Sequence, residues 1–209
     1  MPLKAPLPNL PPDRLARLRG FSRIAGVDEA GRGPWAGPVV AAAVVLSATP
    51  LRVRVGDSKR LTGLQRERAF EAIMASADVG IGIVPAPVID RDNILQAALA
   101  AMRRAVADLR VAPDLVMVDG PLAPPVTMPC WPVVRGDQLS RAIGCASIVA
   151  KVLRDALMTF YDELYPAYGF HQHKGYGTSL HAKRLALHGP SPLHRRSFQP
   201  VRNITEAQR

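Results

Sequence analysis

The chain has 209 residues, of which 48% are hydrophobic, and this length suits one compact domain with at most a small appended element. Its formal charge of +10 makes a polyanion such as nucleic acid the first partner to consider. The two cysteines form no C-x-x-C pair, which disfavours a disulfide or zinc framework, and no apolar run has the length of a membrane span. We therefore expect a cytoplasmic, monomeric protein.

The first half of the chain predicts an α/β arrangement. Residues 1–20 are rich in proline, which predicts a flexible or loosely docked arm with at most a short helical turn. Residues 24–27 and 38–46 have the composition of two buried strands, and the glycine-rich turn between them fits a hairpin. Helical spacing follows over 65–77, and a further strand is predicted over 79–84.

The second half continues this alternation. The pattern predicts a helix over 93–110, a short buried strand over 115–118 and another at Val133-Val134. Residues 140–165 predict a long helix whose small, apolar first half can pack closely on a sheet. Beyond Pro166 all five histidines gather among basic and aromatic residues, which indicates a polar accessory element rather than core.

Acidic residues follow several of these apolar segments. Asp28 and Glu29 directly continue the first strand, Asp119 follows the strand over 115–118, and Asp137 precedes the long helix. Four carboxylates from three places suit hard cations and phosphoryl chemistry. The alternatives are a solvated pair for the first two acids, a plain β-turn for Asp119, and the N-cap of the long helix for Asp137.

A glycine-flanked arginine at 31–33 follows the acid pair and offers bare backbone that a sugar-phosphate chain can approach. Adjacent strand side chains point to opposite faces, so Asp28 and Glu29 can share a metal only where the strand ends and turns. Residues 31–36 also match the glycine-rich dinucleotide-binding motif. That motif requires a helix after its glycines, whereas Pro34 and a predicted strand follow here. The segment therefore indicates a metal site beside a phosphate site.

The C-terminal quarter holds a second candidate contact. Tyr176 lies between two glycines beside basic residues, a pattern typical of an aromatic platform for a base or sugar. A zinc site from His171, His173 and His181 is not favoured, because a lysine intervenes and no cysteine completes it. A solvated loop is the competing interpretation for these histidines. The pair Arg195-Arg196 fits either a phosphate contact or a solvated surface pair.

Taken together, these segments resemble type 2 ribonucleases H, the ribonuclease HII branch, in that family's order. The resemblance covers about residues 23–200 and rests on blocks that include Asp28–Pro34, Val118–Gly120, His173–Thr178 and His194–Phe198. It implies an α/β ribonuclease H-like fold, in which a central mixed β-sheet is flanked by helices and a C-terminal helical accessory element helps to hold the duplex.

The resemblance also implies residue roles. The four catalytic metal ligands, which would hold two Mg²⁺ or Mn²⁺ ions, fall on Asp28, Glu29, Asp119 and Asp137. The segment that reads a ribonucleotide's 2′-hydroxyl through backbone falls on Gly31, Arg32 and Gly33, and the junction-sensing tyrosine on Tyr176. Positions assigned to backbone or phosphate contacts are Ser58, Lys59 and Ser147.

The implied activity is endonucleolytic hydrolysis of the RNA strand of RNA/DNA hybrids. It includes cutting 5′ of single ribonucleotides embedded in duplex DNA, with 3′-hydroxyl and 5′-phosphate products. A catalytic domain is expected over 21–165 and a substrate-binding element over 166–209.

Two other functions are considered. The type 3 branch is the alternative enzyme, disfavoured by the short N-terminus and the form of the glycine segment. A non-catalytic hybrid-binding protein would need no metal ligands. A sliding clamp is a possible partner, although residues 203–209 show no docking motif.

Overall fold

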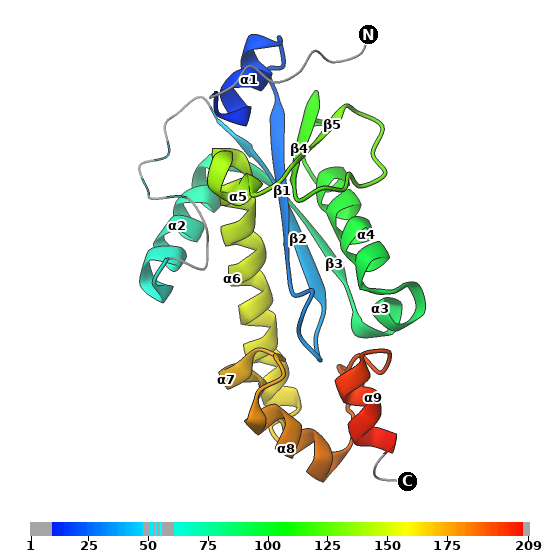
Figure 1. Cartoon of the computed structure of the whole chain (residues 1–209). Helices are drawn as coiled ribbons and strands as arrows, with labels where there is room; N and C mark the ends of the chain where they lie inside the picture. Colours follow the sequence, from blue (N-terminus) through cyan, green and yellow to red (C-terminus); the bar gives the residue numbers. More distant parts are fainter. Residues whose placement is uncertain (1–9, 48–50, 52, 54, 56–60, 207–209) are drawn as a thin grey trace.

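The computed structural model describes residues 10–47, 51, 53, 55 and 61–206. Within these residues a five-stranded sheet with the order β3-β2-β1-β4-β5 forms the centre of the molecule (Figure 1). Its strands are β1 (Ile24–Ala30), β2 (Val39–Leu46), β3 (Ala77–Val84), β4 (Leu115–Asp119) and β5 (Cys130–Val133). Because β1 pairs antiparallel with β2 and parallel with β4, the sheet is mixed, and the predicted α/β class is confirmed.

Helices cover both faces of this sheet. They are α1 (Pro12–Leu18), α2 (Gly63–Ser76), α3 (Ala86–Asp92), α4 (Ile94–Ala107), α5 (Gly136–Leu139), α6 (Arg141–Leu164), α7 (Phe170–His173), α8 (Ser179–His188) and α9 (Gln199–Glu206). Helix α6 packs across β1 and β2 with α2 beside it, and α4 packs on the opposite face (Figure 1). Helices α7 to α9 lie beyond the C-terminal half of α6. No helix in the described part of the chain is long and apolar enough to cross a membrane.

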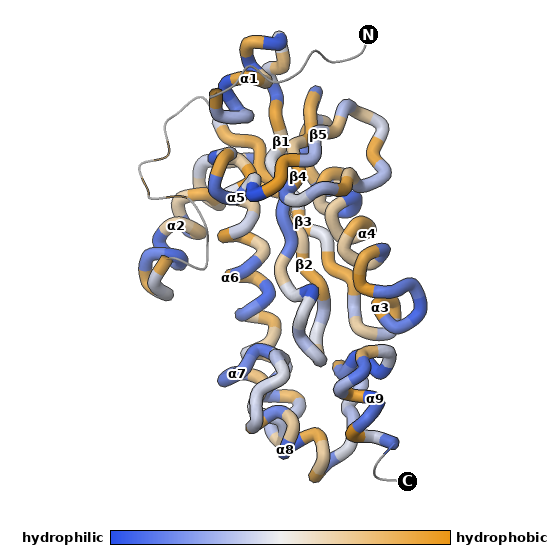
Figure 2. Tube along the Cα trace, in the orientation of Figure 1, coloured by the Kyte–Doolittle hydropathy of each residue, from blue (hydrophilic) through white to orange (hydrophobic). Residues whose placement is uncertain are grey.

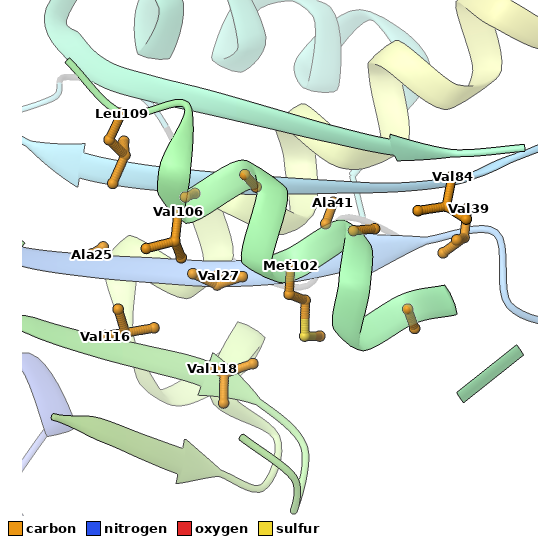
Figure 3. Packing of buried hydrophobic residues seen from close by; sticks show 14 of the residues in the cluster. Ala25, Val27, Val39, Ala41, Val84, Met102, Val106, Leu109, Val116 and Val118 are labelled. Atoms are coloured by element: carbon orange, nitrogen blue, oxygen red, sulfur yellow. The ribbon is translucent and has the colours of Figure 1, made fainter. Parts of the chain in front are cut away.

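Side chains of the central strands alternate between two cores. Val27 and Ala41 pack with Met102 and Val106 of α4 (Figure 3), whereas Ala42 of β2 packs with the small residues of α6. Strand β2 is buried from Val39 to Val45 because helices cover both of its faces. Figure 2 shows the hydrophobic residues concentrated along much of the sheet.

The start of α6 lies directly on β1. A Cβ atom at Gly26 would lie 2.1 Å from the backbone carbon of Ala142, so only glycine allows this approach. Gly26 and Asp28 point to the same face of β1, because side chains alternate along a strand. The close packing of α6 therefore brings its second turn, with Ser147, to the Asp28 carboxylate.

The predicted strands and longer helices are confirmed, with one correction at the start of α6. Ser140 is its N-cap, and the Ser140 hydroxyl accepts a hydrogen bond of 3.2 Å from the N–H of Ile143. The interpretation of Asp137 as this cap is wrong, because the short helix α5 intervenes and Asp137 lies in its first turn. Asp137 instead lines the acidic cavity described below.

Two further boundaries differ from the prediction, and one helix was not predicted. Strand β1 does not end before the acid pair but runs through Asp28 and Glu29 to Ala30, because β2 pairs with all of these residues. Strand β5 spans 130–133 instead of beginning at Val133. Helix α3 was not predicted; it contains one proline, Pro87, in its first turn, where a proline is compatible with a helix.

The N-terminal segment is a further correction over residues 12–18. These residues form α1, in which Ala16 is fully buried. The Asp13 carboxylate accepts hydrogen bonds from the Ser140 hydroxyl (3.1 Å) and from the N–H groups of Arg141 (3.1 Å) and Ala142 (3.3 Å). These amides belong to the first turn of α6 and have no partner within the helix. Helix α1 is therefore a docked cap of α6 and not a loose arm.

Replacing Asp13 by alanine is expected to lower the free energy of unfolding by about 1–2 kcal/mol, the usual cost of losing a side-chain cap. Urea unfolding monitored by circular dichroism measures this. Arg14→Ala, on the exposed side of the same helix, is the matched control and should change stability by no more than about 0.5 kcal/mol. An unfolding midpoint for Asp13→Ala equal to that of the control would contradict the docking of α1.

Candidate active site

A cavity of about 450 Å³ opens where β1 and β4 end beside α6. Its lining combines acidic, glycine and basic residues: Asp28, Glu29, Ala30, Gly31, Arg32, Gly33, Asp119, Asp137, Ser147, Lys151 and Tyr176. The structure thus brings the four predicted carboxylates to one place, together with the glycine-arginine-glycine segment, Ser147 and Tyr176. The remaining candidates, Ser58 and Lys59, lie outside the described residues.

The carboxylates reach the cavity from three elements. Asp28 and Glu29 lie on β1, and Asp119 ends β4, its parallel neighbour. The Asp119 Oδ1 atom accepts hydrogen bonds from the N–H groups of Gly136 (2.6 Å) and Asp137 (3.4 Å) at the start of α5. Asp119 is therefore more than a turn residue, since its side chain holds the segment that carries Asp137 against the end of β4.

Burial, together with repulsion between neighbouring carboxylates, raises the pKa values of the acids on β1. Burial raises the pKa of Asp28 well above its usual range, and the charges of Glu29 and Asp119 raise it further. A hydrogen bond from Ser147 and one from the N–H of Glu29 (2.7 Å) oppose this shift. Burial also raises the pKa of Glu29, whereas Arg32, 3.3 Å away, lowers it. The acids are thus close enough to disfavour one another's ionised forms.

The donor set fits a hard divalent cation. Four carboxylates and no sulfur or imidazole line the cavity, the ligand chemistry that Mg²⁺ and Mn²⁺ prefer, and a bound cation would relieve the repulsion among them. Within the residues that the structure describes, no three His, Cys, Asp or Glu side chains form a group that could hold an ion. An ion here would therefore need water or phosphate oxygens as additional ligands, as Mg²⁺ commonly does.

Arg195 holds the backbone of the loop that follows β1. The Arg195 guanidinium, fully buried, donates hydrogen bonds to the carbonyl oxygens of Gly31 (2.5 Å), Arg32 (2.9 Å) and Gly37 (3.0 Å). Burial lowers the pKa of Arg195 to about 9, and the nearby charge of Arg154 contributes. Both sequence interpretations of Arg195, a phosphate contact and a solvated surface residue, are wrong. Its partner in the pair, Arg196, is exposed.

A second buried arginine supports the same loop. The Arg154 guanidinium donates to the carbonyl oxygens of Pro38 (3.1 Å) and Ala36 (3.2 Å). A Cβ atom at Gly31 would lie 2.1 Å from the Arg154 Nε atom, and Gly31 has a φ of +99°. Only glycine therefore satisfies both the backbone conformation and the available space at position 31.

Three of the C-terminal histidines are buried, which corrects the interpretation of this segment as a solvated polar loop. The rings of His173 and His181 stack with centroids 4.3 Å apart, and the Nε2 atoms of His181 and His194 are 3.0 Å apart. The His181 Nδ1–H donates to the Tyr176 carbonyl (2.9 Å), so its Nε2 accepts from His194. The Nδ1 atom of His194 then accepts from the N–H of Ser191 (3.0 Å).

This network accounts for all the ring nitrogens of His181 and His194 without a metal. His171, a member of the zinc hypothesis, lies apart from the cluster and contacts Asp162 on the surface. The buried histidines instead tie the backbone of Tyr176 to the segment that precedes Arg195. They are structural supports of the cavity wall.

Tyr176 is 43% exposed at the cavity edge, with two cations near its ring. The Lys151 Nζ atom lies 5.9 Å from the ring centroid, and the Arg154 guanidinium carbon lies 5.7 Å from it. Lys151 was not identified from the sequence, although it follows Ser147 by four residues on α6 and so shares its face. It also forms an ion pair of 2.8 Å with Asp155.

Buried carboxylates, accessible glycine backbone and flanking cations at the end of a mixed α/β sheet define a metal-dependent nuclease. The family model for Ribonuclease HII matches residues 25–201. A ribonuclease HII of Geotalea daltonii is 53% identical over 191 residues, which cover 91% of this chain and 88% of that protein. The chain therefore belongs to the ribonuclease HII family, and it is a metal-dependent endonuclease that acts on the RNA strand of RNA/DNA hybrids.

Solved structures agree with this placement. The ribonuclease H2 of Pyrococcus horikoshii superposes with a TM-score of 0.74 at 27% identity, covering 89% of this chain and 98% of that one. The Bst-RNase HIII solved in complex with Mn²⁺ has a TM-score of 0.72 at 17% identity, covering 92% of this chain and 72% of that one. At that identity the second likeness supports the fold alone. The predicted family and ribonuclease H-like fold are confirmed.

The buried histidines predict a loss of stability in acid. Burial lowers the pKa of His181 to about 4 and that of His194 to about 3, below the value of about 6.5 expected in the unfolded chain. The unfolded state therefore binds more protons below pH 6.5, and stability falls as the pH is lowered from there towards 4. Urea unfolding between pH 7.5 and 4 measures the slope.

In His194→Gln this decline should be shallower by up to about 1.4 kcal/mol per pH unit, because one titrating group has been removed. His188→Gln alters an exposed histidine on α8 and should follow the wild-type slope. Equal slopes for His194→Gln and the wild type would refute the assignment of a neutral, buried His194.

Proposed function

We propose that this enzyme also cuts on the 5′ side of a single ribonucleotide embedded in duplex DNA, leaving 3′-hydroxyl and 5′-phosphate ends. In this proposal Asp28, Glu29, Asp119 and Asp137 hold two divalent cations, Mg²⁺ or Mn²⁺. The observation that carries it is the single cavity in which these four carboxylates meet the glycine loop and Tyr176.

The carboxylates and their supports perform separate tasks. Two bound cations would activate a water molecule and stabilise the leaving oxygen of the phosphodiester. Ser147 holds the Asp28 carboxylate by a hydrogen bond, and Asp119 fixes the helix start that carries Asp137. The Mn²⁺ complex of the Bst-RNase HIII, a structure of similar fold, supports Mn²⁺ as one candidate.

The glycine loop is suited to recognising a ribose. Arg32 and Gly33 are exposed at the cavity, and nothing lies within 4 Å of the position that a Cβ atom of Gly33 would take. A sugar can therefore approach the backbone closely. Arg195 holds the carbonyl groups of Gly31 and Arg32, so this backbone is presented in one conformation. The 2′-hydroxyl, the group that separates RNA from DNA, is the proposed contact.

Tyr176 and the basic surface provide the remaining contacts. The exposed ring of Tyr176 would stack on the sugar next to the ribonucleotide and so detect the RNA–DNA junction. Residues 166–209 would hold the duplex, with Lys183 and Arg184 exposed on α8. Ser58, Lys59 and Lys151 are proposed to approach the phosphates. Because much of the affinity would come from charge neutralisation, binding should weaken steeply with salt.

Asp119→Asn is expected to lower the cleavage rate by about 100-fold or more, because a metal ligand supplies several kcal/mol of transition-state stabilisation. Binding of an RNA/DNA hybrid in EDTA should stay within about twofold of the wild type, since it rests on the basic surface. Glu163→Gln, an exposed acid near the end of α6, is the control and should retain full activity. Cleavage by Asp119→Asn at the control rate would remove Asp119 from the metal site.

The substrate itself is tested with a labelled DNA duplex that carries one ribonucleotide, beside an all-RNA/DNA hybrid, in Mg²⁺, Mn²⁺ or EDTA. We expect metal-dependent incision on the 5′ side of the single ribonucleotide and cleavage of the hybrid. Cleavage of the hybrid alone would contradict the proposed single-ribonucleotide activity and indicate type 3 specificity. Binding without cleavage under every metal would contradict catalysis by these carboxylates.

A further inference from the structure

Trp35 joins the two segments that the proposed function assigns to substrate recognition. Its N–H donates a hydrogen bond of 2.8 Å to the carbonyl oxygen of Gly175, immediately before Tyr176. Its own carbonyl oxygen accepts a hydrogen bond of 2.8 Å from the N–H of Arg195. The backbone of this residue, two positions after Gly33, is thus fixed both to the segment that carries Tyr176 and to Arg195.

The Trp35 indole occupies the space beside Gly177, the residue that follows Tyr176. A Cβ atom at Gly177 would lie 2.2 Å from the indole Cε2 atom and 2.7 Å from Nε1. The indole also contacts the ring of His181, with centroids 5.4 Å apart and planes inclined by 36°. His181 in turn donates to the Tyr176 carbonyl at 2.9 Å. The side chain therefore packs against His181, which holds the Tyr176 carbonyl, and against the residue that follows Tyr176.

The Tyr176 backbone is also held by the carbonyl of His173, which accepts a hydrogen bond of 2.9 Å from the N–H of Tyr176, and by the N–H of Thr178, which donates to the Tyr176 carbonyl at 2.8 Å. None of these contacts places Trp35 at the reacting phosphate, and Trp35 does not line the acidic cavity. Besides the bond to Arg195, its contacts join the glycine loop to the Tyr176 segment. It is placed to set the distance between them.

We propose that Trp35 is a positioning residue that sets the spacing between the glycine loop and Tyr176, and thereby the preference for a single embedded ribonucleotide. This inference rests on the proposed function, in which the two segments contact neighbouring nucleotides. A single ribonucleotide offers one register in which its 2′-hydroxyl meets the loop while Tyr176 meets the next sugar. A continuous RNA strand offers a 2′-hydroxyl in every register, so it tolerates an error in this spacing.

The test compares kcat/KM on a duplex with one ribonucleotide and on a continuous hybrid, for the wild type, Trp35→Ala, Gly177→Ala and the double variant. For Trp35→Ala we expect a loss of about 10-fold or more on the single ribonucleotide and about threefold or less on the hybrid. Gly177→Ala should produce the same selective loss, because the added methyl group displaces the indole. In the double variant the second change should add little, since the indole is already absent.

The matched control is the chain's other tryptophan, Trp131 on β5, which packs edge-to-face against Phe21 at 5.5 Å. Trp131→Phe should leave the ratio of the two kcat/KM values unchanged even if it lowers the melting temperature. Melting temperatures of all variants establish that the ratios come from folded protein. An equal loss of activity on both substrates by Trp35→Ala, or an unchanged ratio, would overturn the positioning role.

Fluorescence provides a readout that does not depend on cleavage. In the Trp131→Phe protein Trp35 is the single tryptophan, and adding Gly177→Ala should shift its emission and increase its quenching by acrylamide. An unchanged spectrum would overturn the packing on which the inference stands. If the wild type fails to cut the single-ribonucleotide duplex while the indole responds as expected, the proposed function fails and the packing of Trp35 on the Tyr176 segment stands.

Discussion

The buried guanidinium of Arg195 fixes the backbone on which the cavity depends. Desolvating a cation is costly, and the hydrogen-bond partners of this one are carbonyl oxygens of the β1–β2 loop. A planar group with five donors can bond several carbonyls at fixed angles, which a lysine cannot do. The desolvation cost is offset by these bonds only while the loop keeps its conformation. Any other loop conformation would leave a buried charge without partners, so the interaction restricts the loop to one shape.

The carboxylates of the cavity place negative charges close together, whereas Arg195 is a buried positive charge. Asp28 is nearly fully buried beside Glu29 and Asp119, and the pKa of Asp28 is raised by burial and by both neighbours. The sheet enforces this proximity through the parallel pairing of β1 with β4, and α6 presses on β1 at Gly26. Bringing these acids together lowers the stability of the folded protein, and burial of apolar side chains on both faces of the sheet offsets this cost. A cation that binds the acids would lower their mutual repulsion. Because it binds the folded protein, it would also stabilise the folded state.

The local sequence pattern was sufficient to predict the strands and helices whose formation depends on residues close in the sequence. Apolar runs predicted the strands that carry Asp28 and Asp119, and helical spacing predicted α4 and α6. Helix α3 was not predicted, and the strand end before Asp28 was misplaced because pairing with β2 decides it. The buried states of Arg195 and His194 follow from contacts with residues more than 150 positions away, and side-chain polarity alone suggests the surface.

The C-terminal segment is physically continuous with the catalytic half. Ala36 forms an isolated bridge with His194, and the N–H of Gly37 donates to the carbonyl of Leu193 at 2.8 Å, so residues near 194 extend the backbone framework of the β1–β2 loop. The same segment reaches Tyr176 through the pair of His194 and His181. The segments to which we assign substrate recognition are therefore joined by one hydrogen-bonded framework. We therefore expect a change near His194 to affect the glycine loop through the hydrogen bonds of this framework, although no carboxylate of the cavity is altered.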